Sequence, residues 1–77
     1  MVVLESYSTH DLWVAAFLRA RGMRLSGTAR VGNRVLFEFE DKEACGQLAI
    51  EYLNGGTADV SALKAAWNDL KTLIFDR

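Results

Sequence analysis

The spacing of hydrophobic residues changes several times along the chain, and each change marks the boundary of a predicted element. Hydrophobic residues recur at the 3.6-residue period of a helix in three segments, residues 8–22, 41–56 and 60–75. They alternate with polar residues, loosely in the first case, in three other segments, residues 2–7, 24–31 and 35–40. The pattern therefore predicts the order strand, helix, strand, strand, helix, helix.

The first predicted helix has signals at both ends. Thr9, or alternatively Ser8, serves as its N-cap, and Asp11 lies in the first turn, where the helix dipole favours a negative charge. Gly22 follows the last turn and can adopt the left-handed conformation that ends a helix. The helix is therefore predicted to stop before the alternating segments begin.

The two longer strands are predicted to form a hairpin, because Gly32–Asn33 is a turn signal between them. A strict two-residue loop would place Arg30 opposite Val35, on the face that carries the aromatic residues. Burial of one apolar face instead favours a three-residue loop, residues 32–34, or a bulge at Gly27 with the same effect. The predicted pairs are then Val31 with Val35, Ala29 with Phe37, and Gly27 with Phe39.

The second and third helices each show an N-cap and an apolar stripe. Asp41 is the predicted N-cap of the second helix, and residues 54–56, Asn-Gly-Gly, end it. Ser61 is the predicted N-cap of the third. The stripes are Cys45, Leu48, Ala49 and Tyr52 in the second helix, and Leu63, Ala66, Trp67, Leu70, Leu73 and Ile74 in the third.

These elements predict one small α+β domain over residues 1–77, with the order (β)-α-β-β-α-α. An antiparallel sheet would be covered by helices packed on one of its faces. A chain of this size buries only roughly 60–65% of its unfolded surface, so its core needs support. Cys45 is the single cysteine and His10 the single histidine, which excludes an internal disulfide and a structural zinc site. We therefore expect no cofactor, and either efficient packing or self-association.

The same features indicate the compartment. One free cysteine fits a reducing environment, and residues 1–8 lack the basic start and apolar core of a signal peptide. The longest apolar run, residues 12–18, is far shorter than the ~20 residues that cross a bilayer. The expectation is a soluble, cytoplasmic protein that makes no contact with a membrane.

Charge is distributed unevenly in a chain whose net charge is −1. Residues 12–37 carry +5 and no acidic residue, and the remainder carries −6. One hypothesis is a phosphate-binding surface, with three of the five arginines on the open sheet face and two at its edge. The residues concerned are Arg24, Arg30 and Arg34 on the face, and Arg19 and Arg21 at the edge.

Each arginine also has a structural explanation, which we favour over nucleic-acid binding. Arg19 and Arg21 complement the C-terminal end of a helix, and Arg30 is expected to pair with Glu38 across the hairpin. Glu38 and Glu40 on the same face would repel phosphate. The outward strand positions also lack an aromatic residue on which a base could stack.

Catalytic chemistry has little support in this sequence. His10 and Asp11 are adjacent, so their side chains leave the helix start about 100° apart and do not orient one another. Cys45 lies on an apolar stripe and is predicted to be a small buried residue. No glycine-rich phosphate loop and no metal-binding set of carboxylates is present. We therefore predict no catalytic, cofactor-binding or metal-binding residues, and a protein that is not an enzyme.

The first helix is apolar around its whole circumference over residues 12–18, LWVAAFL. A surface helix normally has one apolar stripe, so this helix is either buried on all sides or covered on one face by another chain. Burial on all sides is difficult in so short a chain. We therefore favour self-association, most simply as a homodimer, through Trp13 with Phe17 and Val14 with Leu18.

Several short motifs resemble a family of small bacterial and phage-associated domains of unknown function. They are a Thr-x-Asp-Leu helix start with a following glycine, a Phe-x-Phe strand ending in acids, a Tyr-x-Asn-Gly turn, and a Leu-Lys pair in the last helix. The matching residues are Thr9, Asp11, Leu12, Gly22, Phe37, Phe39, Tyr52, Asn54, Gly55, Leu70 and Lys71. The resemblance implies the same fold and residence on mobile or phage-derived DNA, and it supplies no catalytic residues.

The sequence thus predicts a non-enzymatic interaction module that self-associates and binds a macromolecular partner, with a protein as the favoured partner. The alternative is nucleic-acid binding through residues 19–34. A small-molecule pocket between sheet and helices is a third possibility.

Overall fold

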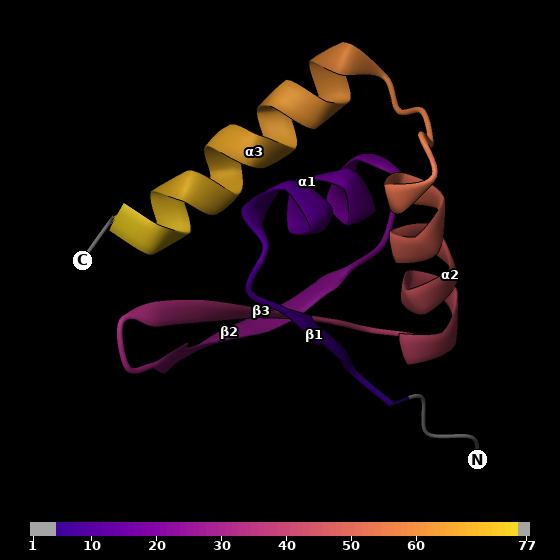
Figure 1. Ribbon diagram of the computed structural model, residues 1–77. Coiled ribbons are helices and arrows are strands. Elements are labelled where there is room, and N and C mark those ends of the chain that lie inside the picture. Colours follow the sequence, from indigo (N-terminus) through magenta and orange to yellow (C-terminus); the bar gives the residue numbers. More distant parts are fainter. Residues whose placement is uncertain (1–4, 76–77) are drawn as a thin grey trace.

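Three helices lie on one face of a three-stranded antiparallel sheet in the part of the chain that the structure describes, residues 5–75 (Figure 1). The structure is a computed structural model. Its elements are β1 (Tyr7–Thr9), α1 (Leu12–Ala20), β2 (Leu25–Val31), β3 (Arg34–Phe39), α2 (Lys42–Leu53) and α3 (Val60–Phe75). The predicted α+β class and element order are confirmed. Of the predicted first strand, residues 2–4 lie outside the described residues, and β1 begins only at Tyr7.

The central strand of the sheet is β3, which supplies its most deeply buried side chains. The strand order is β1-β3-β2, and Tyr7 and Leu25 lie opposite Phe39 from its two sides. Phe37 and Phe39 are 1% and 0% exposed and belong to the core cluster with residues of all three helices. The helix-facing side of the sheet is therefore set by alternation along β3.

The hairpin between β2 and β3 has the two-residue loop, so the predicted three-residue loop is wrong. Val31 pairs with Arg34, and Arg30 lies opposite Val35. Gly32 has a φ of +61°, which suits the first central position of a type II′ turn. The predicted pair between Arg30 and Glu38 is also wrong, because Glu38 lies opposite Gly27 in this register.

A register shift between Leu25 and Gly27 explains how the sheet tolerates this loop. The shift lies where the alternative prediction put a bulge, but it restores apolar pairing only for Leu25, opposite Phe39. Thr28 and Arg30 remain on the same side as the aromatic residues and are exposed. Burial of apolar pairs is thus enforced only at the end of the hairpin that the helices cover.

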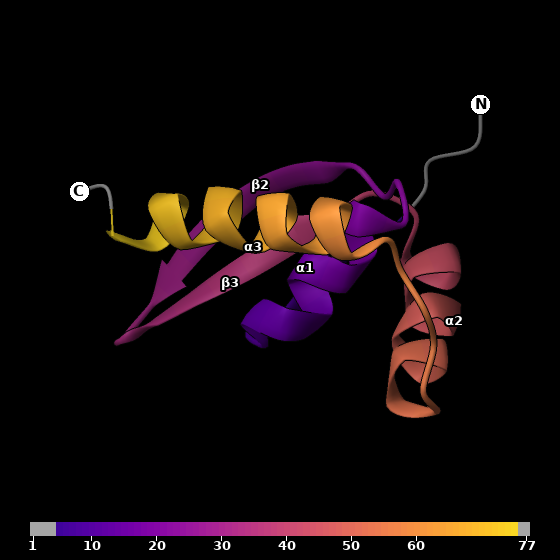
Figure 2. The ribbon, with the colours of Figure 1, turned by 90° about the horizontal axis from the view of Figure 1, so that it is seen from above.

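The core surrounds α1, which packs against β1, α2 and α3. Its residues Val14 to Leu18 are all buried, between 0% and 8% exposed. Ala15 and Ala16 are the small side chains in this run, and they let neighbouring elements approach the helix axis closely. Figures 1 and 2 show α1 between the sheet and α3, with α2 across its C-terminal end. The helix is therefore buried on nearly all sides by its own chain.

An aspartate accepts backbone hydrogen bonds at the start of each of the three helices. The N-cap of α1 is Asp11, whose Oδ1 accepts hydrogen bonds from the backbone N–H groups of Trp13 (2.9 Å) and Val14 (3.2 Å). The predicted caps Thr9 and Ser8 are wrong, because both residues belong to β1. Thr9 instead supports the cap, since its Oγ1 accepts a hydrogen bond from the Asp11 N–H.

The start of α3 shifts in the same way. Asp59 Oδ2 accepts a hydrogen bond from the Ala62 N–H at 2.9 Å, and the predicted cap, Ser61, lies inside the helix. The predicted cap of α2 is confirmed, because Asp41 Oδ1 accepts from the Ala44 N–H at 3.1 Å. The end signal of the first helix is also confirmed, since Gly22 has a φ of +95°.

Removal of the α1 cap tests this assignment. We expect Asp11→Ala to lower the free energy of unfolding by about 1 kcal/mol, because two backbone N–H groups lose their acceptor. His10→Ala is the matched control, since His10 is exposed and makes no side-chain hydrogen bond with the described residues. Urea denaturation of the two variants measures the difference, and equal stabilities would contradict the assignment.

Candidate interaction surface

The five arginines predicted to form one surface are separated in the structure. Arg19, at the end of α1, lies 3.8 Å from Asp69 of α3, measured between Nη2 and Oδ2. Arg24, before β2, lies 3.6 Å from Glu40, after β3, measured between Nε and Oε2. Both pairs are partly open to solvent, so each adds little to stability. Each of these two arginines nevertheless has a carboxylate of the same chain as its partner.

Arg21 has the most contacts of the five. Its guanidinium pairs with the carboxylate of Glu51 on α2 and donates a hydrogen bond to the Thr57 carbonyl at 3.0 Å. The same group lies 5.5 Å from the ring centroid of Phe17. Arg21 therefore joins the end of α1 to α2 and to the segment that leads into α3.

Arg30 and Arg34 make no ion pair with other residues in the range 5–75. The two side chains project to opposite faces of the sheet, because Arg30 lies opposite Val35 and Arg34 lies opposite Val31. The predicted arrangement of Arg24, Arg30 and Arg34 on one open face is therefore wrong. The cause is the two-residue loop, which moves Arg30 to the helix-facing side.

The candidate catalytic groups are not assembled into a site. His10 and Asp11 line an open hollow of about 380 Å³ with Arg34, Val35, Phe37 and Ile74. None of these lining residues carries a hydroxyl or thiol nucleophile.

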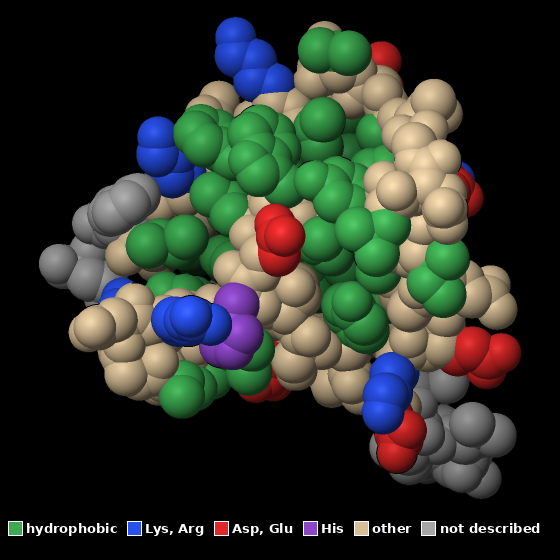
Figure 3. All heavy atoms as spheres, viewed as in Figure 1, with side chains coloured by type: hydrophobic (Ala, Val, Ile, Leu, Met, Phe, Trp, Pro, Cys, Tyr) green, Lys and Arg blue, Asp and Glu red, His purple; other side chains and the backbone are tan. Residues whose placement is uncertain are grey.

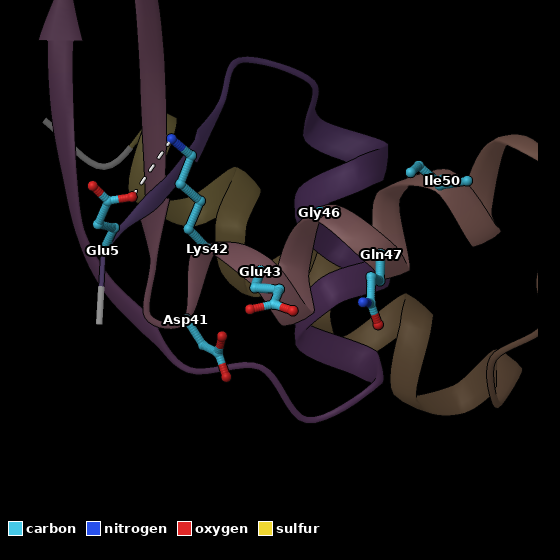
Figure 4. A pocket seen from close by; sticks show the side chains of 7 residues that line it. All are labelled: Glu5, Asp41, Lys42, Glu43, Gly46, Gln47 and Ile50. Atoms are coloured by element: carbon cyan, nitrogen blue, oxygen red, sulfur yellow. Dashed lines mark ion pairs between the residues drawn. The ribbon is translucent and has the colours of Figure 1, made fainter. Parts of the chain in front are cut away.

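A larger open hollow of about 520 Å³ lies beside the start of α2 (Figure 4). Three carboxylates line it, those of Glu5, Asp41 and Glu43. Lys42 Nζ lies 3.8 Å from Glu5 Oε1, and Figure 4 shows the other two carboxylates apart from this pair. Asp41 is engaged as the helix cap. No described group of three or more His, Cys, Asp or Glu residues is arranged to hold a metal ion.

Cys45 is buried, as predicted, and it is held as a thiol. Burial raises its pKa above the ordinary value of 9.0, and the nearby negative charge of Asp41 raises it further. The thiol donates a hydrogen bond to the Glu40 carbonyl at 3.3 Å. These surroundings disfavour the thiolate, which is the reactive form of cysteine.

The raised pKa predicts a loss of stability at alkaline pH. Above the ordinary cysteine pKa the unfolded chain loses the Cys45 proton, while the folded chain retains it until its own higher pKa is reached. The free energy of unfolding should therefore fall more steeply between about pH 8 and about pH 10 in the wild type than in Cys45→Ala. Urea denaturation across this range checks the difference, and parallel pH profiles would show that Cys45 does not contribute.

An apolar surface is the most distinct feature of the outer molecule. Trp13 of α1 stacks on Trp67 of α3, with ring centroids 5.4 Å apart and an interplanar angle of 22°. Trp13 is nevertheless 50% exposed. The pair borders an open hollow of about 210 Å³. We call the residues that line this hollow the tryptophan face: Trp13, Val60, Leu63, Lys64 and Trp67.

The tryptophan face is part of a wider apolar area. Figure 3 shows many hydrophobic side chains gathered over the side of the molecule formed by α3, α1 and α2, with an acidic side chain among them. The most exposed large hydrophobic residues of the helices are Val60 and Leu53, at 78% and 77%, and Ile50 follows at 61%. Contiguous apolar surface of this kind marks interaction sites more often than scattered exposed residues do.

Of the four residues predicted to mediate self-association, only Trp13 belongs to this surface. Trp13 is exposed within it, but Val14, Phe17 and Leu18 are 8%, 3% and 0% exposed. Those three side chains are corrected to buried residues: Val14 and Leu18 belong to the core cluster, and the Phe17 ring lies against Tyr52 of α2 with ring centroids 5.5 Å apart. The prediction missed Val60, and it assigned Leu63 and Trp67 to the core-facing stripe of the last helix. The tryptophan face combines side chains of α1 and α3, so it does not appear as a periodic stripe in the sequence of either helix.

Trp67 has one unfavourable feature. Its Nε1 atom is buried and has no hydrogen-bond partner among the described residues. An unpaired buried donor costs about 1–3 kcal/mol. Lys71 Nζ, 4.3 Å from the Trp67 ring centroid, provides a favourable cation–π contact on the exposed side. Packing within this chain therefore does not by itself explain why residue 67 is a tryptophan.

Comparison with known proteins adds no assignment: no family model matches the chain, and no curated protein or solved structure is significantly similar to it. The resemblance to small bacterial and phage-associated domains stays a prediction. None of the three described helices combines the length and the apolar composition that crossing a bilayer requires.

Proposed function

We propose that the protein is a non-enzymatic interaction module that self-associates and binds a macromolecular partner, with the tryptophan face as the contact between copies. The observation that carries the proposal is the half-exposed Trp13, which stacks on Trp67 at the centre of exposed apolar side chains. Tryptophan is enriched in the energetically dominant positions of protein interfaces.

The small core supports a second copy as the occupant of the tryptophan face. Domains of this size rarely gain more than about 3–5 kcal/mol from one hydrophobic core, and they are supported by disulfides, metals or oligomerisation. One cysteine excludes an internal disulfide, and the described residues hold no metal-binding cluster. Oligomerisation would therefore add to the stability that the packing around α1 provides.

Charge also favours a symmetric contact. Lys64 and Lys71 lie on the α3 side of the tryptophan face, and Asp11 lies two residues before Trp13 at the start of α1. In a two-fold dimer the same patch of both copies is in contact, in opposite orientation. We expect such an arrangement to bring the lysines of one copy toward the aspartate of the other. The surface is complementary to itself in sign as well as in apolar character.

We further propose that the protein acts in the cytoplasm, where its buried thiol stays reduced. The free cysteine supports this compartment, since Cys45 has no disulfide partner in its own chain.

Val60→Glu tests the proposed contact without disturbing the core. Val60 is 78% exposed and is the first residue of α3, where the helix dipole favours a carboxylate. In the dimer the same carboxylate would be desolvated against apolar side chains. We expect the dimer dissociation constant to rise by about tenfold or more. Sedimentation velocity over a range of protein concentrations measures it.

Val31→Glu is the matched control for this experiment. Val31 is 57% exposed and lies in β2, away from the tryptophan face, and the substitution changes the net charge equally. Its dissociation constant should equal that of the wild type, and circular dichroism confirms that both variants fold. A wild type that stays monomeric at all concentrations, or a control that dissociates as the Val60 variant does, would refute the tryptophan face as the dimer contact.

A further inference from the structure

We propose that the free edge of β2 binds an extended acidic segment of another protein and adds it to the sheet as a further strand. The proposal deepens the interaction-module function by naming the class of partner, and it rests on that function but not on the tryptophan face. β2 is an edge strand in the order β1-β3-β2, and β3 is its one extensive neighbour among the described elements. Figure 2 shows β2 along one side of the molecule and α1 on the other.

Backbone groups suitable for strand addition lie at Thr28 and Arg30. In an antiparallel pair closed by a two-residue turn, the residues next to the turn exchange hydrogen bonds, and every second residue directs its backbone groups outward. Val31 and Arg34 flank this turn, so the outward residues of β2 are Arg30 and Thr28. Their side chains are exposed as well. The edge is therefore a template for one more strand.

The bulge limits how far such a strand can extend. The register shifts between Leu25 and Gly27, and the Ser26 hydroxyl donates a hydrogen bond to the Glu38 carbonyl at 3.1 Å. A bulge interrupts the regular spacing of edge groups. The available template therefore runs from Gly27 to Val31, and it suits a short extended segment better than a long strand.

Charge selects an acidic occupant for this edge. Residues 24–34 contain three arginines and no acidic residue. Arg24 is paired with Glu40, whereas Arg30, which lies in β2 itself, has no ion pair with other residues in the range 5–75. A second copy paired through its own β2 would align two sets of arginines and be repelled. A segment rich in aspartate or glutamate would be attracted.

Among the described residues, Arg30 is the unpaired arginine of the β2 edge itself, whereas Arg34 belongs to the central strand β3 and lines the hollow that contains His10 and Asp11. Successive side chains of an added strand alternate between the two faces of the sheet, so every second one would lie on the face that carries Arg30. On the helix-facing side, Arg30 borders a hollow of about 170 Å³ with Thr28, Val35 and Leu73. The hollow has an apolar wall and a cationic rim, so it can receive the stem and the carboxylate of a glutamate.

A fluorescein-labelled peptide of alternating glutamate and valine, with blocked ends, tests the proposal by fluorescence anisotropy at about 50 mM salt. We expect saturable binding that Arg30→Glu weakens by about fivefold or more. The control variant is Lys42→Glu, which changes the net charge equally at a residue outside both β2 and the tryptophan face, and it should bind as the wild type does. A peptide of alternating lysine and valine should not bind.

Changes in the peptide separate strand addition from charge attraction and need no altered protein. N-methylation of alternate peptide nitrogens removes the backbone donors that pair with β2, and it should abolish binding. Equal binding of the methylated peptide, absence of binding by the unmodified one, or stronger Arg30-dependent binding of single-stranded DNA would each overturn the proposal. Val60→Glu should bind the peptide as the wild type does, so a failure of strand addition is distinguishable from a failure of self-association.

Discussion

The burial of α1 is the constraint on which the rest of this structure depends. In so short a chain, one helix that is apolar on every side takes most of the available core, and β3, α2 and α3 are arranged around it. Ala15 and Ala16 make this possible, because small side chains let the neighbouring elements close on the helix. Trp13 lies at the rim of that core, so its exposure is a direct result of how α1 is covered.

Electrostatics in this protein connects elements more than it defines one external field. The arginines at the end of α1 and before β2 meet acidic residues of α3, α2 and the end of β3. The excess of positive charge in the first half of the chain is therefore largely balanced by carboxylates that come later in the sequence. What is left over lies near the hairpin turn, on both faces of the sheet. The arginines therefore do not form one continuous positive surface.

Much of the fold was predictable from local signals, and the parts that were not depend on tertiary coverage. The element order, Gly22 as a helix end, Asp41 as a cap and the aromatic face of β3 all follow from spacing and turn chemistry. The predicted hairpin register is wrong because it requires burial of the whole apolar face, whereas the helices leave the Arg30 end exposed. The N-caps of α1 and α3 failed because Thr9 joins a strand and Asp59 precedes Ser61 with a stronger acceptor.

The interaction surface could be predicted only in part for a related reason. Trp13 could be predicted as a surface contact because it lies in residues 12–18, a helix segment with no polar face. Trp67, in contrast, has the spacing of an ordinary core-facing stripe. Their stacking arises from the crossing of α1 and α3, two helices whose relative position is not encoded in the period of either sequence. The arginines gave the opposite error, since a cluster in the sequence was dispersed by the two-residue loop and by acids from distant elements.

The pairing of α1 with α3 also has a consequence for how the protein is made. Leu12–Ala20 leaves the ribosome well before Val60–Phe75, which supplies much of its cover. During that interval the nascent chain exposes the apolar segment of residues 12–18, and exposed apolar segments of this kind promote aggregation during synthesis. The hairpin and α2, which emerge in between, can shelter part of it. Completion of the core waits for the last helix, so translation rate and chaperone access bear directly on the yield of folded protein.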